Sequence, residues 1–267
     1  MNATHTINAH TIERTSLPRS HEILHTQVAA FLALLKGLDA EDWYRPTACA
    51  RWRVRDVVAH MIGQAEEGVR PVVLLRRMRR GQRLYPALPA LDGHNQCQVD
   101  DRRTVGPDEL IDHYLHWSDR WLRAVRRLPT PLLKIPLSWV FPDTAALRDN
   151  SLDYLVKVLM ARDVWMHRLD VADATSKIFA PANGDRDIVE QVISDLARDW
   201  TAPSVLLDLN GVTPARYALG VGETTATVTG GVLALMRHLA GRARSGDLVI
   251  TGDPRVVAAM ENARVEF

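Results

Sequence analysis

Asp163 and His167 are the residues of this sequence whose types and spacing point most directly to chemistry. Both fall in a predicted helix over residues 145–172, where a step of about 100° per residue places them about 40° apart on one face. The rest of that face is apolar and is formed by Leu152, Val156, Leu159 and Met160. Such a face should enter the core of a helical bundle, where an ionised carboxylate needs a compensating partner.

Two arrangements would compensate a buried Asp163. In the first, Asp163 and His167 form a structural pair that is satisfied by hydrogen bonds or by an arginine. In the second, the carboxylate and the imidazole, at positions i and i+4, bind one divalent metal ion. Bundle cores are a known location for such ligands from facing helices. The helical spacing alone leaves both arrangements open.

A metal site with an open coordination position needs about three protein ligands, so a third residue is required. His60, which lies beside Val57 and Met61 in another predicted helix, is the best candidate. His113 and His116 on the third predicted helix are its competitors. The remaining histidines have poorer contexts, in the N-terminal part, a loop or the C-terminal region, and are His5, His10, His21, His25, His94 and His238.

Four long helices must position these residues. Apolar residues recur at spacings of three and four in each of them, and Pro71 should kink or split the second. Prolines 86 and 89 are expected to break the chain into a loop that contains His94. Prolines 107 and 129 bracket the third helix. The helices are predicted over residues 20–38, 54–79, 107–127 and 145–172. Four amphipathic helices in succession predict a four-helix bundle.

The pattern changes after Pro181, where short strands and helices replace the long helices. Strands are predicted over residues 204–209, 216–219, 225–229 and 247–251, and helices over 185–200, 231–239 and from 254. A block of this kind predicts a small α+β domain. We therefore expect a flexible tail over residues 1–17, a helical bundle over 18–180 and an α+β domain over 181–267.

Composition excludes several classes of protein. The chain has 33 basic and 32 acidic residues and a formal net charge of +1, so no strong field selects a nucleic acid or an anionic membrane. Cys49 and Cys97 cannot form a disulfide framework, and Cys49 is interpreted as a packing residue. The polar start lacks the apolar core of a signal peptide. We expect a cytoplasmic protein, monomeric or homodimeric, without a nucleic-acid or membrane partner.

The motifs around these residues resemble a known family. The run CARWRVRDVVAH at residues 49–60 and the run DVWMHRLD at residues 163–170 are similar to signatures of the mycothiol-dependent maleylpyruvate isomerase family. That family belongs to the DinB-like group of metal-binding four-helix bundles. The runs ATVTG at 226–230, GR at 241–242 and LVITGDP at 248–254 resemble the sterol-carrier-like C-terminal domain common in the family.

The resemblance implies a site and a cofactor. It implies a zinc ion held by His60, Asp163 and His167, although the family usually has a glutamate where this chain has Asp163. It also implies mycothiol, the small thiol of actinobacteria, and a role for Arg242 in catalysis or in binding the thiol cofactor. A simpler reading of Arg242 is a solvated cation at a helix end. The arginine-rich run at 76–80 is typical of a solvated helix end, and its Arg80 is predicted to bind the cofactor.

The function that follows is thiol chemistry at a metal. A thiol bound to Zn²⁺ is deprotonated and can attack an electrophilic small molecule. Retention of the adduct would give an S-transferase, and loss of the thiol after bond rotation would give an isomerase. The breadth of the family favours general thiol transfer, with maleylpyruvate cis–trans isomerisation as the narrower possibility. A metal-dependent hydrolase and a non-catalytic metal-binding sensor are two rival functions for the same ligand set.

Overall fold

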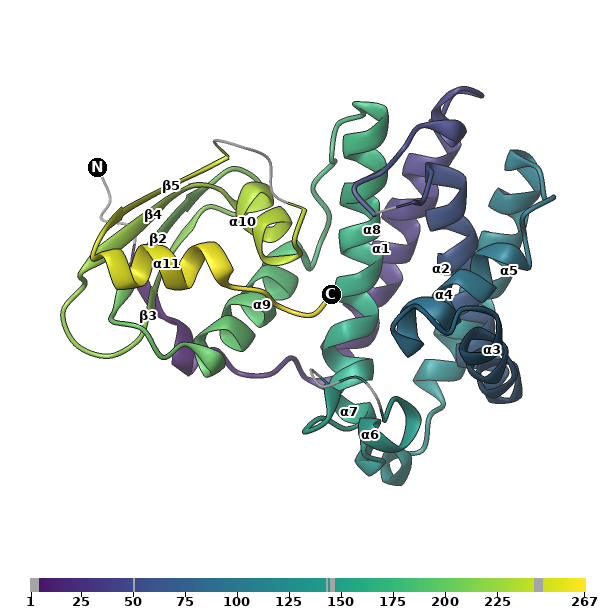
Figure 1. Ribbon diagram of the computed structural model, residues 1–267, viewed down its shortest axis with the longest axis horizontal. Helices are drawn as coiled ribbons and strands as arrows, with labels where there is room; N and C mark the ends of the chain where they lie inside the picture. Colours follow the sequence, from purple (N-terminus) through teal and green to yellow (C-terminus); the bar gives the residue numbers. More distant parts are fainter. Residues whose placement is uncertain (1–4, 50, 143, 145–146, 243–246) are drawn as a thin grey trace. The chain divides into compact units, whose positions relative to one another are not determined.

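The protein is described by a computed structural model that covers residues 5–49, 51–142, 144, 147–242 and 247–267. The chain forms two compact units. One unit is Ser16–Ala182, and the other joins the residues up to Thr15 to Asn183–Phe267. The first unit is helical and the second combines helices with a sheet (Figure 1). The predicted fold class, a helical bundle followed by a small α+β domain, is confirmed.

Four helices form the bundle of the first unit. Helix α1 contacts α5 and α8, and α2 contacts the same two helices, so the four enclose one core. Phe31, Tyr114 and Trp121 are among the largest buried side chains of this core. In the described part of the chain, every helix is too short or too polar to cross a bilayer. The bundle helices are α1 (Leu17–Lys36), α2 (Val54–Val69), α5 (Pro107–Arg126) and α8 (Met160–Thr175).

The helix predicted over residues 54–79 is two helices, as Pro71 indicated. Helix α2 ends at Val69, and α3 (Pro71–Leu84) begins with this proline. At the first helical position the missing N–H of proline removes no hydrogen bond, and its fixed φ suits the helix. Pro71 therefore ends one helix and begins the next.

Helix α4 (Ala90–Asp100) was not predicted, because prolines near residue 89 were expected to leave a loop here. That expectation is wrong, since Pro89 is the cap residue that precedes the helix and does not interrupt it. Helix α4 packs on α3. A Cβ added at Gly81 would lie 2.6 Å from the carbonyl carbon of Gly93, so this close approach requires glycine. His94, predicted to lie in a loop, is buried on α4.

The fourth predicted helix differs at its start. Residues 145 and 146 lie outside the described residues, and regular helix begins with the single turn of α7 (Leu152–Tyr154). Leu155–Leu159 is then π-helical and leads into α8. A π-helical turn contains more residues than an α-helical one, so a constant step of about 100° per residue does not hold there. Before it, Thr130–Lys134 forms a 3₁₀ helix and Leu137–Val140 forms α6.

The second unit is built on a sheet that has five strands within the described residues, in the order β1-β3-β2-β4-β5. The pairs β2–β3 and β4–β5 are antiparallel, whereas β1–β3 and β2–β4 are parallel. Alternate side chains of β2 and β3 are buried, which is the pattern of a sheet with one covered face. The strands are β1 (Thr6–Asn8), β2 (Val205–Asn210), β3 (Ala215–Leu219), β4 (Ala226–Gly231) and β5 (Leu248–Gly252).

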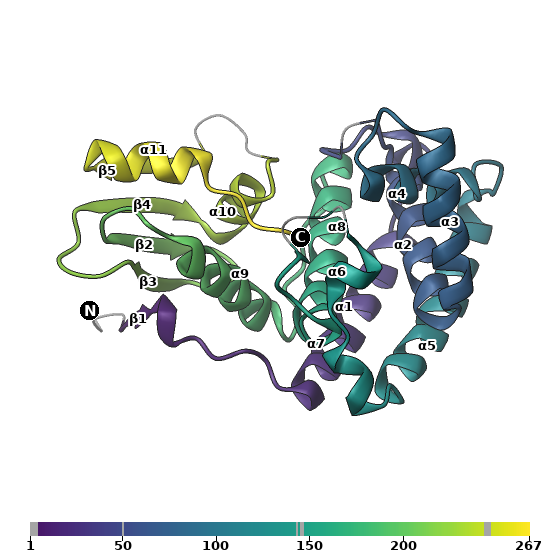
Figure 2. The ribbon, with the colours of Figure 1, turned by 60° about the horizontal axis from the view of Figure 1, so that its bottom comes forward.

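Among the described residues of this unit, three α-helices accompany the sheet (Figure 2). Helix α10 contacts β4 and α9, and α11 contacts β5. Val192, Leu235 and Met260, one from each helix, are fully buried, so each helix presents an apolar face. The helices are α9 (Asp185–Asp199), α10 (Val232–Leu239) and α11 (Pro254–Asn262).

The prediction of a flexible tail over residues 1–17 is wrong for its central part. Strand β1 pairs in parallel with β3, with Ile7 opposite Tyr217, and the buried Ala9 begins a 3₁₀ turn. Strand pairing uses backbone groups that an edge strand leaves open, so a short polar segment can join a sheet without an apolar pattern. Residues 1–4 lie outside the described residues.

Candidate metal centre

Three ligating side chains converge from two bundle helices. His60 comes from α2, and Asp163 and His167 come from α8. One ligand atom from each lies within 4.8 Å of the others. Nε2 of His167 is 3.5 Å from Oδ1 of Asp163, and the two imidazole centroids are 5.1 Å apart. The structure thus brings together the three residues that the sequence predicted as ligands.

Helix α2 presents His60 from an apolar face. Val57 and Met61, its neighbours on the helix, are buried in the bundle core. The start of α2 is fixed by Asp56, whose Oδ2 accepts a hydrogen bond of 2.9 Å from the backbone N–H of Arg53. A carboxylate that accepts a hydrogen bond from the residue preceding the helix satisfies a free backbone donor, and its negative charge interacts favourably with the helix dipole. The helix that carries His60 therefore has a well-defined start.

Trp52, which lies two residues before α2, also lies against the centre. Its ring centroid is 5.0 Å from that of His60 and 6.5 Å from that of His167. A turn closed by the hydrogen bond from Trp52 N to Cys49 O, 3.0 Å long, precedes the helix. The indole N–H donates to Oε1 of Gln96 at 3.2 Å. The indole thus covers both imidazoles with an apolar surface.

His60 is buried and neutral. Its Nδ1 is 2.6 Å from Oε1 of Gln98. Burial lowers the pKa of His60 to about 4, with a further contribution from the nearby His167, while Asp163 and Gln98 act in the opposite direction. Because Nδ1 is engaged, Nε2 is the nitrogen that remains for a ligand.

His167 has the opposite charge state. Its Nδ1 is 3.0 Å from Oδ2 of Asp170. Burial alone would lower the pKa of His167, but the charge of Asp163 and the hydrogen bonds to Asp170 and Cys49 outweigh it and raise that pKa well above its usual value. Without a metal, His167 therefore carries a proton near neutral pH, and its Nε2 faces Asp163.

Asp163 is only partly satisfied. Its Oδ1 interacts with His167, but its Oδ2 is buried and has no hydrogen-bond partner among the described residues. A buried carboxylate oxygen without a partner is costly. A purely structural Asp–His pair, satisfied by its own hydrogen bonds, leaves this oxygen unexplained. A cation at this position would satisfy it.

A second group of ligating atoms lies on the other side of His167. The thiol of Cys49 donates to Oδ2 of Asp170 at 3.2 Å, and Sγ is 3.9 Å from Nδ1 of His167. These atoms already bond to one another, whereas the carboxylate of Asp163 is left with a free oxygen. We therefore take the group with Asp163 as the candidate metal centre. Cys49, interpreted from sequence as a packing residue, makes polar contacts here.

Sequence reasoning missed two residues that hold the histidines. Asp170 lies three positions after His167 on the same helix, so its spacing already placed it on a neighbouring position. Gln98 lies on α4, the helix that was not predicted, and no sequence signal connected it with His60. The competitors His113 and His116 belong to neither group of ligating side chains found among the described residues.

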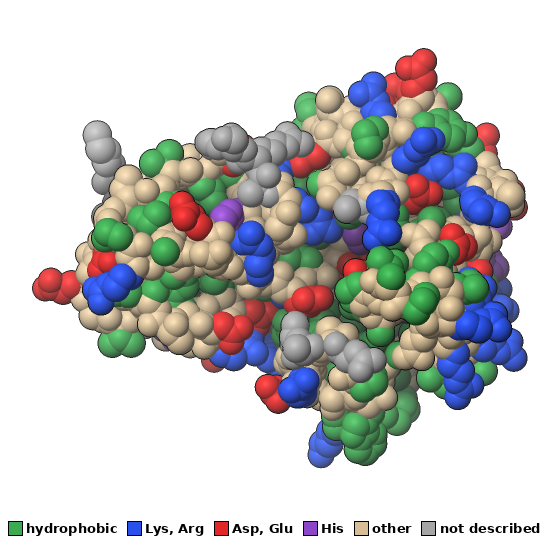
Figure 3. Space-filling model, viewed as in Figure 1, with side chains coloured by type: hydrophobic (Ala, Val, Ile, Leu, Met, Phe, Trp, Pro, Cys, Tyr) green, Lys and Arg blue, Asp and Glu red, His purple; other side chains and the backbone are tan. Residues whose placement is uncertain are grey.

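The arginine-rich run lies within α3 and is not a solvated helix end throughout. Basic side chains gather over the α3 side of the helical unit (Figure 3), yet Arg77 is only 4% exposed. Arg80 donates to the carbonyl oxygen of Cys97 at 2.8 Å and pairs with Asp101 at 2.5 Å. The predicted cofactor-binding role of Arg80 would have to compete with these contacts.

Arg242 follows α10 in the second unit. Gly241 has φ 71°, and the backbone N–H of Arg242 bonds to the carbonyl oxygen of Arg237 at 2.7 Å. This is the Schellman arrangement that ends many helices and favours glycine. The Gly-Arg pair thus has a structural reason for its glycine. The predicted role of the Arg242 side chain stays a prediction.

The donor set defines what the centre can do. Two imidazole nitrogens and one carboxylate oxygen are ligands that zinc accepts, and three protein ligands leave one coordination position for another group. The residues present therefore fit a divalent metal site of the open, catalytic kind.

Comparison with known proteins relates this centre to a family. The sequence model described as the mycothiol maleylpyruvate isomerase N-terminal domain matches residues 24–172. The crystal structures of the mycothiol-dependent maleylpyruvate isomerase and of a histidine-to-alanine mutant of it are similar, each with a TM-score of 0.59, at 18% and 17% identity. Each similarity covers 94% of this chain and 98% of the other and shows the fold. Among curated proteins, none matches the sequence.

Proposed function

The chain belongs to the family of the mycothiol maleylpyruvate isomerase N-terminal domain, as its motifs predicted, and on that premise we propose that it is a metal-dependent enzyme that uses mycothiol. The metal is bound by His60, Asp163 and His167. The reaction is the addition of a thiol to an electrophilic carbon of a small molecule, in S-transfer or in thiol-assisted isomerisation.

The unsatisfied Oδ2 of Asp163 is the observation that supports the metal most strongly. It is a buried acceptor with no donor among the described residues, and it lies beside two imidazoles whose Nδ1 atoms are engaged elsewhere, so that Nε2 of each is the nitrogen left for a metal ion. A bound cation would satisfy a buried acceptor of this kind. Zinc at three such ligands would supply an open position at which a thiol is held as a thiolate.

The residues of the chain contribute binding and orientation. Asp163 and the two histidines would hold the ion, and Asp170 would keep the ring of His167 in place through Nδ1. Trp52 would exclude water from one side of the imidazoles. The aspartate at 163 is one methylene shorter than a glutamate, so the approach of α8 to α2 must bring the carboxylate closer to the ion.

Two arginines complete the proposal. Arg242 is proposed to bind an anionic group of the thiol cofactor or substrate, because a guanidinium forms bidentate contacts with carboxylates. Arg80 is proposed as a weaker cofactor contact, since Asp101 already holds it. We expect Arg242→Ala to raise the KM for an anionic substrate more than Arg80→Ala does.

Maleylpyruvate isomerisation is the narrower candidate. The observation that favours it is the fold shared over 94% of this chain with the crystal structure of the mycothiol-dependent maleylpyruvate isomerase. Assay of maleylpyruvate against a panel of electrophiles, each with mycothiol, separates the two: conversion without a retained adduct supports isomerisation, and a stable thiol adduct supports S-transfer.

The metal assignment is tested with one variant and a matched control. Asp163→Asn keeps the shape of the side chain and removes its charge, and Asp112→Asn removes a charge from α5 away from the ligands. We expect the first to weaken zinc binding by about 100-fold or more, above the range for residues outside the ligand shell, and the second to leave it unchanged. Equal zinc affinities of the wild type and Asp163→Asn, measured by chelator competition, would contradict the assignment.

A further inference from the structure

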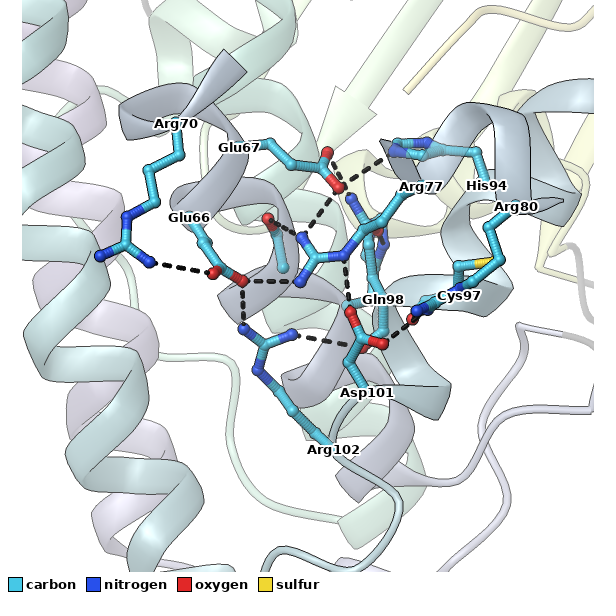
Figure 4. A network of polar contacts seen from close by, with 12 residues as sticks. Glu66, Glu67, Arg70, Arg77, Arg80, His94, Cys97, Gln98, Asp101 and Arg102 are labelled. Atoms are coloured by element: carbon cyan, nitrogen blue, oxygen red, sulfur yellow. Dashed lines mark hydrogen bonds and ion pairs between the residues drawn. The ribbon is translucent and has the colours of Figure 1, made fainter. Parts of the chain in front are cut away.

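A chain of buried hydrogen bonds connects His60 through Gln98 to a network of charged side chains. Figure 4 shows this network, which includes Glu66, Glu67 and Arg77. Gln98 of α4 lies in the middle of this chain. Its Oε1 is 2.6 Å from Nδ1 of His60, and its Nε2 donates to Oε2 of Glu67 at 2.8 Å. Gln98 is 1% exposed and Glu67 is 6% exposed, so water does not substitute for these contacts.

The carboxylate of Glu67 determines the direction of the chain. An ionised carboxylate only accepts hydrogen bonds, so the amide of Gln98 must turn its NH₂ group toward Glu67. Its carbonyl oxygen then faces His60 and also only accepts. The proton on the neutral ring of His60 must therefore lie on Nδ1, which leaves the lone pair on Nε2. This direction follows from donor and acceptor chemistry alone.

Glu67 is itself held in place. Its Oε1 accepts hydrogen bonds from Arg77 at 2.9 Å and from Nε2 of His94 at 3.0 Å. Arg77 also donates to Glu66 at 2.6 Å and to Asp101 at 2.8 Å. Because both donors already occupy Oε1, the other oxygen of Glu67 is the one left for Gln98. The charged network thus fixes the end of the chain that lies farthest from the metal centre.

Gly63 gives the amide room to reach His60. A Cβ added at this position would lie 2.5 Å from Cβ and 2.7 Å from Cγ of Gln98. Gly63 follows His60 by three residues, so both lie on neighbouring positions of α2. The absence of a side chain at Gly63 therefore allows Gln98 to pack against the same face of α2 that carries His60.

We propose that Gln98 and Glu67 are positioning residues that hold His60 in its Nδ1–H tautomer and so direct the lone pair of Nε2 to the metal centre. The proposal rests on the proposed function for the metal, but the tautomer is a property of the metal-free protein. Partners of this kind typically change metal affinity by about 10- to 100-fold. Neither residue belongs to a motif that pointed to the site.

The tautomer of His60 tests the proposal directly. Two-bond ¹H–¹⁵N correlations of the metal-free full chain, labelled with ¹⁵N-histidine at pH 7, distinguish the two neutral tautomers. The signal of His60 is assigned by its loss in His60→Gln. We expect the Nδ1–H tautomer in the wild type. An Nε2–H tautomer there would overturn the proposal without any variant.

Glu67→Gln should reverse the donor–acceptor direction of the hydrogen bonds that run from residue 67 through Gln98 to His60. The new amide keeps an oxygen toward Arg77 and His94 and presents an NH₂ group to Gln98, which must then turn and offer its own NH₂ group to His60. We expect His60 to move to the Nε2–H tautomer and the zinc Kd to rise by about 10- to 100-fold.

Glu66→Gln is the matched control, because it removes a charge from the same network without touching Gln98. We expect it to leave the tautomer of His60 unchanged and to change the zinc Kd by less than about threefold, well below the effect of an outer ligand partner. An unchanged tautomer in Glu67→Gln, or equal effects of the two variants, would overturn the proposal.

Gln98→Met covers the case in which Glu67→Gln does not fold, since it keeps the volume of the side chain and removes the amide. In this variant, a mixture of the two tautomers at His60 would support the proposal. A His60 that remains entirely in the Nδ1–H tautomer would contradict it. A further outcome is a wild type that shows the Nδ1–H tautomer at His60 and yet binds no zinc. That result would contradict the proposed function but would still support the role of Gln98 and Glu67 in fixing the tautomer.

Discussion

The two histidines of the candidate metal centre are oriented alike but by different partners. Each uses Nδ1 in a hydrogen bond and keeps Nε2 for the centre. The partner of His60 is the neutral amide of Gln98, and burial lowers the pKa of this histidine to about 4. For His167, burial is outweighed by Asp163 and by Asp170, and the pKa is raised. In the metal-free centre, His167 of α8 is therefore the charged imidazole, and His60 of α2 is neutral with an open lone pair on Nε2.

The surroundings of the two histidines differ as well. On the α2 side, Gln98 leads to Glu67 and Arg77 and so to several buried charges. On the α8 side, His167 is supported by Asp170 and the thiol of Cys49. Loss of a charge from the network on the α2 side should therefore lower the stability of the helical unit. Loss of the Asp170 carboxylate should instead change the pKa of His167 and the affinity for the metal. Variants on each side can separate these two effects.

The largest expected effect is on stability. Arg77→Met leaves Glu66 and the buried Glu67 without their shared cation, and breaking a buried pair costs about 3–5 kcal/mol. Denaturant unfolding should show this loss, while Arg79→Met, on the same helix but outside the network, should change the unfolding free energy by less than about 0.5 kcal/mol. Equal values for the two variants would show that the network does not stabilise the helical unit.

The next effect is the pH dependence of metal binding. A metal ligand must be deprotonated, and His167 is protonated below its raised pKa in the metal-free protein. The zinc Kd should therefore be constant above that pKa and should rise about tenfold for each pH unit below it. His60 adds a second proton only near pH 4. Chelator competition across the pH range measures the slope; a slope of about two at pH values well above the pKa of His60 would contradict the unequal histidines.

Asp170→Asn should have a smaller effect. The amide oxygen can still accept from Nδ1 of His167, but the hydrogen bond to a carboxylate, which helps Asp163 to raise the pKa of His167, is lost. We expect the zinc Kd at high pH to rise by about tenfold and the start of the pH-dependent range to move to lower pH. Asp173→Asn on the same helix is the control. A tautomer change at His60 in Asp170→Asn would show that the two sides are not independent.

Much of the fold could be predicted because its helices bury apolar faces. The spacing of apolar residues located α1 and α5, and Pro71 marked the division between α2 and α3. Helix α4 was not predicted, because Pro89 was interpreted as a residue that interrupts helices although it is the cap residue that precedes this one. Strand β1 escaped because its pairing depends on the backbone edge of β3 and not on its own sequence pattern.

The site was predictable only where its chemistry lies on one helix. Asp163 and His167 are one turn apart, so helical geometry placed them together, and the apolar face around them required a partner. The contact of His60 with them depends on how α2 packs on α8, which the motif implied and the residues alone did not. Gln98 could not be found, because its role follows from the approach of α4 to Gly63.

The central claim is that His60, Asp163 and His167 hold one metal ion. Crystals of the full chain grown with zinc, measured above and below the zinc absorption edge, test it most directly. We predict one anomalous peak between α2 and α8. It should lie about 2.0–2.2 Å from a nitrogen of His60, from a nitrogen of His167 and from a carboxylate oxygen of Asp163. A zinc peak coordinated by Cys49 and Asp170, or no peak at these helices at saturating zinc, would contradict it.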